Sequence, residues 1–125
     1  MITEDYVSFE IAKLLKERGF NEPIWTRYED DNEVIFGDKY NWNNSPMGHT
    51  SAPTLQMAMK WLRKEHNILL FPLPAQENGK LVYLVEVWTW NEEEGIYEST
   101  YAPMPRKEPE QAVEAALEYS LKNLI

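Results

Sequence analysis

The chain contains no cysteine among its 125 residues. This absence excludes disulfides, thiol nucleophiles and cysteine-ligated zinc or iron–sulfur sites. Basic residues are also scarce, since 12 Lys and Arg stand against 21 Asp and Glu, which gives a formal net charge of −9. We expect phosphate backbones and anionic lipids to repel such a chain, so direct nucleic-acid binding and membrane binding are not predicted.

Long hydrophobic runs are missing as well, because the longest apolar run is residues 68–75, far short of a membrane span. The N-terminus carries Glu4 and Asp5 where a signal peptide has basic residues. These features predict a cytoplasmic protein. The length is typical of one domain, and 43% hydrophobic residues with five Trp, seven Tyr and four Phe are enough for a core. We therefore expect a single domain over residues 1–125.

Three segments place apolar residues at helical spacing. The first helix is expected to begin at a Thr3 cap and to end at Gly19, where a glycine followed by Phe20 is typical of a Schellman end. The second is expected from about residues 51–52 to Asn67, and the third from Pro109 to the C-terminus.

Five β-prone runs separate these helices, at residues 24–28, 34–36, 68–73, 81–90 and 96–101. An acidic turn at residues 29–33 joins the first pair, and Asn78-Gly79 favours a tight turn between the third and fourth. Residues 37–52 are read as a long loop. The order α-β-β-α-β-β-β-α predicts an α+β fold, in which one antiparallel sheet of about five strands is packed by three helices.

Three parts of the chain resemble a family of small proteins from gut anaerobic bacteria, often encoded near prophage or other mobile-element genes. The resemblance is carried by Thr3-Glu4-Asp5-Tyr6-Val7-Ser8-Phe9-Glu10 with residues 13–20, by Ala52-Pro53-Thr54-Leu55-Gln56-Met57-Ala58 with residues 60–63, and by residues 114–121. These parts cover about half of the chain. The family has no established activity or catalytic residues, so none is carried over to this chain. The resemblance implies a bacterial or phage origin, a cytoplasmic location and an accessory role.

His49 and His66 are the only imidazoles, and their spacing places no two metal ligands on one helical face. We expect neither a metal nor a cofactor. His49 lies beside Ser45, so a nucleophile and base could pair in the 37–52 loop, although no nucleophile elbow, oxyanion glycines or acid partner accompany them. A catalytic His49 would need a concave pocket and a nearby carboxylate, whereas a binding protein predicts an exposed or isolated ring.

The strongest candidate binding surface is aromatic. Strand alternation places Trp88 and Trp90 on one face, with Glu86 beside them, and the next strand can bring Tyr97 and Tyr101 within reach. Aromatic side chains on a sheet bind partners through large, rigid contacts. The alternative is that the 37–52 loop covers this face, with Tyr40 and Trp42 packing down as its anchors.

A basic group, Lys60, Arg63 and Lys64, shares one face of the second helix and could contact an anion or simply face solvent. Taken together, the residues predict a non-catalytic accessory or regulatory domain that binds a protein partner, associated with mobile elements. The alternatives are a small hydrolase or ligand-binding enzyme with a site in the 37–52 loop, an acidic nucleic-acid mimic, and a homodimer formed through the sheet.

Overall fold

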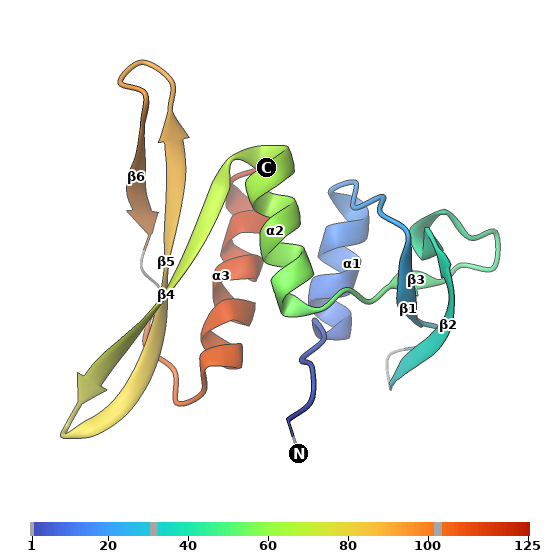
Figure 1. Ribbon diagram of the computed structural model, residues 1–125, viewed down its shortest axis with the longest axis horizontal. Helices are drawn as coiled ribbons and strands as arrows, with labels where there is room; N and C mark the ends of the chain where they lie inside the picture. The colour runs from blue at the N-terminus through green and yellow to red at the C-terminus, as the bar shows by residue number, and fades with distance from the viewer. Residues whose placement is uncertain (1, 31–32, 102–103) are drawn as a thin grey trace. The chain divides into compact units, whose positions relative to one another are not determined.

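The computed structural model describes residues 2–30, 33–101 and 104–125, with side chains for all of these except residue 101 (Figure 1). Within these ranges it has three α-helices and six strands, and the strands form two separate three-stranded antiparallel sheets. The chain divides into two compact units, Met1–Ala58 and Met59–Ile125, which we call the N-terminal and C-terminal units and describe one at a time. The expectation of a single domain stays a prediction.

The first helix, α1 (Phe9–Glu17), begins later than the sequence predicts. Ser8, not Thr3, is the N-cap, and its hydroxyl accepts a 3.3 Å hydrogen bond from the Ile11 N–H. The expected C-terminal end is confirmed, because Gly19 has a φ of 92° and the Phe20 N–H donates to the Leu15 carbonyl at 2.9 Å.

The N-terminal sheet has the strand order β2-β1-β3, made of β1 (Ile24–Tyr28), β2 (Val34–Tyr40) and β3 (Thr50–Ser51). The expected hairpin forms, but β2 is longer than predicted, and the 37–52 loop also contains β3 and the short 3-10 helix η1 (Trp42–Asn44). Asn43 holds the two-residue strand β3 through hydrogen bonds to Ser51. The Asn43 side-chain oxygen accepts from the Ser51 N–H at 2.7 Å, and the Asn43 N–H donates to the Ser51 hydroxyl at 3.1 Å.

The core of the N-terminal unit lies between α1 and this sheet. The apolar face of α1 and the inward positions of β1 are fully buried, namely Ile11, Ala12, Leu15, Ile24 and Tyr28. The segment before α1 is extended rather than helical. The Val7 N–H donates to the Pro53 carbonyl at 3.0 Å, the Leu55 N–H donates to the Asp5 carbonyl at 2.9 Å, and Tyr6 forms a β-bridge with Thr54.

The second helix, α2 (Leu55–His66), starts in the N-terminal unit and continues in the C-terminal unit. Its start is three to four residues later than expected, because residues 53–55 pair with the extended N-terminal segment. The hydroxyl of Thr54 accepts from the Met57 N–H at 3.1 Å. The expected end is confirmed at Asn67, which has a φ of 54°.

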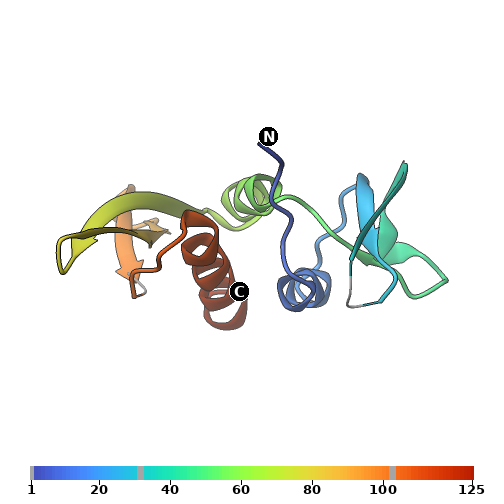
Figure 2. The same ribbon diagram turned by 90° about the horizontal axis from the view of Figure 1, so that it is seen from below.

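The C-terminal unit is built on a meander of β4 (Ile68–Glu77), β5 (Lys80–Asn91) and β6 (Ile96–Tyr101) in that order. Asn78 and Gly79 both have positive φ and form a two-residue turn, so the Asn-Gly turn is confirmed, but β4 runs to Glu77 rather than ending at residue 73 as predicted. The last helix, α3 (Pro109–Asn123), packs against β4 and β5 (Figures 1 and 2). Its buried side chains are Ala112, Val113, Ala116, Leu117, Ser120 and Leu121.

The α+β class and the antiparallel pairing are confirmed, whereas the single sheet of about five strands is wrong. The observed order is α-β-β-β-α-β-β-β-α, since β3 adds a strand before α2. The strands of each unit pair only with one another. In the described ranges, no strand of β1–β3 hydrogen-bonds to a strand of β4–β6. Over the described residues, none of the helices has the length and apolar character needed to cross a membrane.

Candidate functional site

The C-terminal sheet packs one face against α3, and its opposite face is partly exposed to solvent. Ile68, Leu70, Val85 and Val87 are buried on the α3 side. Alternate residues of a strand point to opposite faces, so their neighbours belong to the other side. The register pairs Leu69 with Trp88, Phe71 with Glu86, Leu73 with Leu84, and Trp90 with Tyr97. We call these eight residues the aromatic sheet face.

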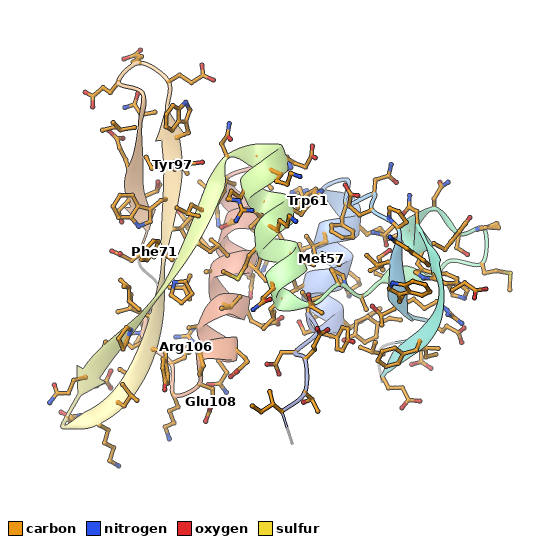
Figure 3. All side chains as sticks on the ribbon, in the orientation of Figure 1. Met57, Trp61, Phe71, Tyr97, Arg106 and Glu108 are labelled. Atoms are coloured by element: carbon orange, nitrogen blue, oxygen red, sulfur yellow. The ribbon has the colours of Figure 1, made fainter. Side chains whose placement is uncertain are left out.

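The aromatic sheet face is only partly shielded from solvent. Phe71 is 51% exposed and Trp90 is 41% exposed, and Figure 3 shows Phe71 on β4 and Tyr97 on β6. The rings of Trp90 and Tyr97 pack edge to face with centroids 5.2 Å apart. Edge-to-face pairing stabilises two aromatic rings even where solvent reaches them. The structure therefore brings together the Trp90 and Tyr97 side chains that the sequence placed on one surface.

The other residues predicted for this surface are Trp88, Tyr101 and Glu86, and their surroundings differ from those of Trp90 and Tyr97. Trp88 is half-buried, and its indole N–H has no acceptor within the described part of the chain. Tyr101 pairs with Val87 through its backbone, next to a shift in register, and its side chain lies outside the described residues. Glu86 is half-exposed and opposite Phe71, so it keeps access to water and none of the described side chains forms a salt bridge with it.

Tyr40 and Trp42 belong to a separate cluster in the N-terminal unit. Their rings lie 5.1 Å apart, and the indole N–H of Trp42 donates to the Ile24 carbonyl at 2.9 Å. The Arg27 guanidinium stacks over the Trp42 ring at 4.3 Å, and the His49 ring meets the same indole at 5.6 Å. Trp42 thus organises the 37–52 loop as an anchor within its own unit.

His49 has polar neighbours on both ring nitrogens. Its Nδ1 lies 3.2 Å from the Ser45 hydroxyl, and its Nε2 lies 3.6 Å from Glu29 Oε1. The side chain is 15% exposed. The ring is neither isolated nor exposed, contrary to the expectation for a purely binding protein. The expected lack of an acid partner is also wrong, because the β1–β2 hairpin brings Glu29 to the loop, a proximity that sequence spacing does not reveal.

The neighbours of His49 are also held by structural contacts. The Arg27 guanidinium donates to Glu29 Oε1 from Nη2 at 2.8 Å and from Nε at 3.2 Å. The Ser45 hydroxyl accepts from the Met47 N–H at 3.2 Å, and the Lys16 ammonium donates to the His49 carbonyl at 2.8 Å. Serine, histidine and carboxylate occur in the order of a nucleophile, base and acid, but the carboxylate is already neutralised by arginine.

A pocket in the N-terminal unit was not foreseen from the sequence. Its volume is about 380 Å³, and it lies between the extended N-terminal segment, β1, β2 and the start of α2. The residues that line it are Glu4, Tyr6, Ile24, Trp25, Thr26, Phe36, Gly37, Pro53, Thr54 and Met57. Trp25 is 58% exposed and Phe36 is 68% exposed, so these aromatic side chains are open to solvent.

The pocket is lined by aromatic residues and by one acidic residue, Glu4. The rings of Tyr6 and Phe36 meet edge to face, with centroids 5.9 Å apart and planes at 89°. Burial, and secondly the negative charge of Glu4, raises the pKa of Tyr6 above its ordinary value of 10.0. The Thr3 cap expected from the sequence would place Glu4 and Tyr6 in a helix, but both precede α1. The signal that could have revealed the pocket is Ser8, a better N-cap than Thr3, which frees residues 3–7 to be extended.

The remaining predicted residues lie on α2. Lys60, Arg63 and Lys64 are exposed, and none of them makes a salt bridge with another described residue. His66 contacts Trp61 with ring centroids 4.9 Å apart. Across the described ranges, no group of three or more His, Asp or Glu side chains is arranged to hold a metal ion.

Comparisons with protein-family models, with curated proteins and with solved structures find no match to this chain. The resemblance to proteins of gut anaerobic bacteria therefore stays a prediction.

Proposed function

We propose that this protein is a non-catalytic binding domain and that the aromatic sheet face is its contact surface for a protein partner. The observation that carries the proposal is that the exposed Phe71 and Trp90 and the half-buried Tyr97 lie together on the sheet face opposite α3. Tryptophan and tyrosine are enriched among the residues that contribute most to binding energy at interfaces. An apolar face of this kind on a sheet is a typical site of association.

The negative charge around the aromatic sheet face favours a partner with basic residues. Residues 81–105 contain five glutamates and no Lys, Arg or His. Three of them, Glu92 to Glu94, form the turn between β5 and β6, where the Asn91 side chain accepts from the N–H groups of Glu93 and Glu94. A partner with an apolar centre and a basic rim complements such a surface, and complementary charge speeds its association.

The accessory or regulatory role rests on this surface together with the predicted resemblance to mobile-element proteins. Such a role needs recognition of another protein rather than turnover of a substrate. The aromatic sheet face supplies rigid rings for the centre of an interface, and the acidic turn supplies charge at its edge.

The test compares capture of partners by the wild type, by Trp90→Ala and Tyr97→Ala, and by Tyr40→Ala, a control at an exposed aromatic residue of the other unit. Circular dichroism confirms folding of each variant. We expect a partner with a basic contact surface that is lost from the first two variants, kept by Tyr40→Ala and weakened by salt. Equal capture by all the variants would overturn the proposal. A concentration-dependent dimer abolished by Trp90→Ala would instead assign the face to a second copy of this chain.

A second candidate function is ester or amide hydrolysis in the 37–52 loop. The specific observation in its favour is the 3.2 Å approach of the Ser45 hydroxyl to His49 Nδ1, with Glu29 beside the other ring nitrogen. The rate of p-nitrophenyl acetate hydrolysis by the wild type, Ser45→Ala and His49→Gln tests whether this cluster is catalytic. Activity above background that both variants abolish would make the protein an enzyme. Equal rates in all three would leave the cluster a structural one.

A further inference from the structure

The pocket of the N-terminal unit has the walls of a cation-binding site. Three aromatic residues, Tyr6, Trp25 and Phe36, line it together with the apolar Ile24 and other side chains. Glu4 is the one charged residue among the described residues that line it. The faces of aromatic rings carry negative electrostatic potential and attract cations, so rings and carboxylate favour the same sign of charge.

We propose that this pocket binds a quaternary ammonium group, such as the trimethylammonium head of choline or of a trimethylated lysine. A quaternary ammonium ion has a positive charge beneath an apolar methyl surface, so it suits a wall that is both aromatic and acidic. A metal cation would need several oxygen ligands, and an anion would be repelled by Glu4. The inference concerns a site separate from the aromatic sheet face and does not rest on the proposed protein partner.

The size and surroundings of the pocket agree with this ligand. A volume of about 380 Å³ is within the range of small-molecule sites and holds a head group with part of its chain. Residues 1–58 contain ten acidic and five basic side chains, so the unit as a whole attracts cations. Within the described ranges Glu4 forms no salt bridge, which leaves its carboxylate available to a ligand.

Part of the wall, formed by Tyr6, Phe36 and Pro53, is held in place by contacts within the unit. Tyr6 is fixed by its β-bridge to Thr54 and by its edge-to-face contact with Phe36. The Val7 N–H donates to the Pro53 carbonyl, which holds the wall formed by Pro53 against the extended segment. A preformed site avoids the entropy loss of ordering its side chains on binding.

The first experiment titrates choline and its uncharged carbon analogue, 3,3-dimethylbutanol, into the whole chain and follows binding by tryptophan fluorescence and by NMR. The two compounds have the same shape and differ in charge. We expect saturable binding of choline and about two- to fivefold weaker binding of the alcohol, as one solvent-exposed cation–π contact predicts. Equal affinities, or no saturable binding of choline, would overturn the proposal.

Substitutions then separate the contributions of charge and rings. Glu4→Gln should weaken choline binding about fivefold and leave the alcohol unaffected, whereas Glu22→Gln, an exposed acidic control in the same unit, should change neither. Phe36→Leu keeps an apolar side chain but removes the ring, so it should weaken choline more than the alcohol. Both changed residues are exposed, and circular dichroism verifies the fold. Unchanged choline binding in Glu4→Gln and Phe36→Leu would contradict the site.

A third comparison identifies the source of the ammonium group. Short peptides that contain trimethylated lysine, unmodified lysine or no lysine are titrated alongside choline. Tighter binding of the trimethylated peptide than of choline would support a protein-borne ligand, and the reverse would support a free small molecule. If the unmodified lysine peptide binds as tightly as the trimethylated one, the selectivity for a quaternary ammonium is refuted.

Discussion

The hydroxyl of Tyr28 donates a 2.7 Å hydrogen bond to the backbone carbonyl of Val7, and both residues are buried. The bond joins β1 to the extended segment that precedes α1. Val7 also pairs with Pro53, so the segment is held on two sides. Tyr6, the neighbour of Val7, is thereby placed at the wall of the pocket rather than in the first turn of a helix. The pocket therefore depends on a contact between residues that are distant in the sequence.

Tyr28→Phe removes this hydroxyl and leaves the Val7 carbonyl without its buried donor. Loss of one partner of a buried hydrogen bond costs about 1–3 kcal/mol, and we expect the free energy of unfolding to fall by that amount. Chemical denaturation measures the change. Tyr40→Phe is the matched control, since Tyr40 is exposed and its ring contact with Trp42 does not need the hydroxyl. Equal losses in the two variants would show that the bond to Val7 is not what stabilises the segment.

The raised pKa of Tyr6 predicts a specific loss of stability in alkali. The unfolded chain releases this proton near 10.0, whereas the folded chain holds it to higher pH. The unfolded state then binds fewer protons than the native state, so the free energy of unfolding falls as the pH rises from 10.0 through the folded pKa. Denaturation on either side of this pH should show a smaller fall in Tyr6→Phe than in the wild type.

Removal of the Glu4 charge should bring the pKa of Tyr6 closer to its ordinary value. In Glu4→Gln the carboxylate no longer opposes formation of the phenolate, and only the larger effect of burial remains. Ultraviolet titration of tyrosine, with Tyr6→Phe used to assign the signal, measures the shift. A Tyr6 pKa that does not move would mean that Glu4 and Tyr6 are not neighbours in the pocket.

Gly37→Ala should disturb the cluster around Trp42. A Cβ at position 37 would collide with the Arg27 guanidinium, which stacks on Trp42 and binds Glu29. Because the long Arg27 side chain can move aside, we expect a loss of about 1 kcal/mol, the value of its displaced cation–π contact. Chemical denaturation of the wild type, Gly37→Ala, Arg27→Met and the double variant completes a double-mutant cycle that tests this cause. An equal cost of Gly37→Ala in both backgrounds would exclude Arg27 as the origin.

Gly19→Ala should destabilise α1 through the backbone alone. Gly19 has a φ of 92°, and among the described residues no atom outside its own stretch of chain lies within 4 Å of the position a Cβ would take. An alanine in the left-handed region costs about 1–2 kcal/mol, whereas asparagine, which tolerates that region better, should cost less. Thermal and chemical denaturation of Gly19→Ala and Gly19→Asn provide the comparison. Equal stability of Gly19→Ala and the wild type would mean that the helix does not need this conformation.

The features that could be predicted from the sequence depend on residues close together in the chain. The Schellman end at Gly19 and the turn at Asn78-Gly79 follow from local backbone preference. The contact of Trp90 with Tyr97 follows from strand alternation and a short connection. Ser8 is the better local cap, but the bridge between Tyr6 and Thr54 joins distant segments and could not be predicted in this way.

The sequence by itself determined the α+β class, the three helices, and the acidic, cysteine-free character of this protein, since periodicity and composition are properties of short windows. Only the tertiary structure decided that the strands form two sheets, that Glu29 lies beside His49, and that Glu4, Tyr6, Trp25 and Phe36 share a pocket. Each of these depends on pairing between distant segments. Such pairing is selected by the burial and hydrogen bonding of the whole unit, which no local pattern specifies.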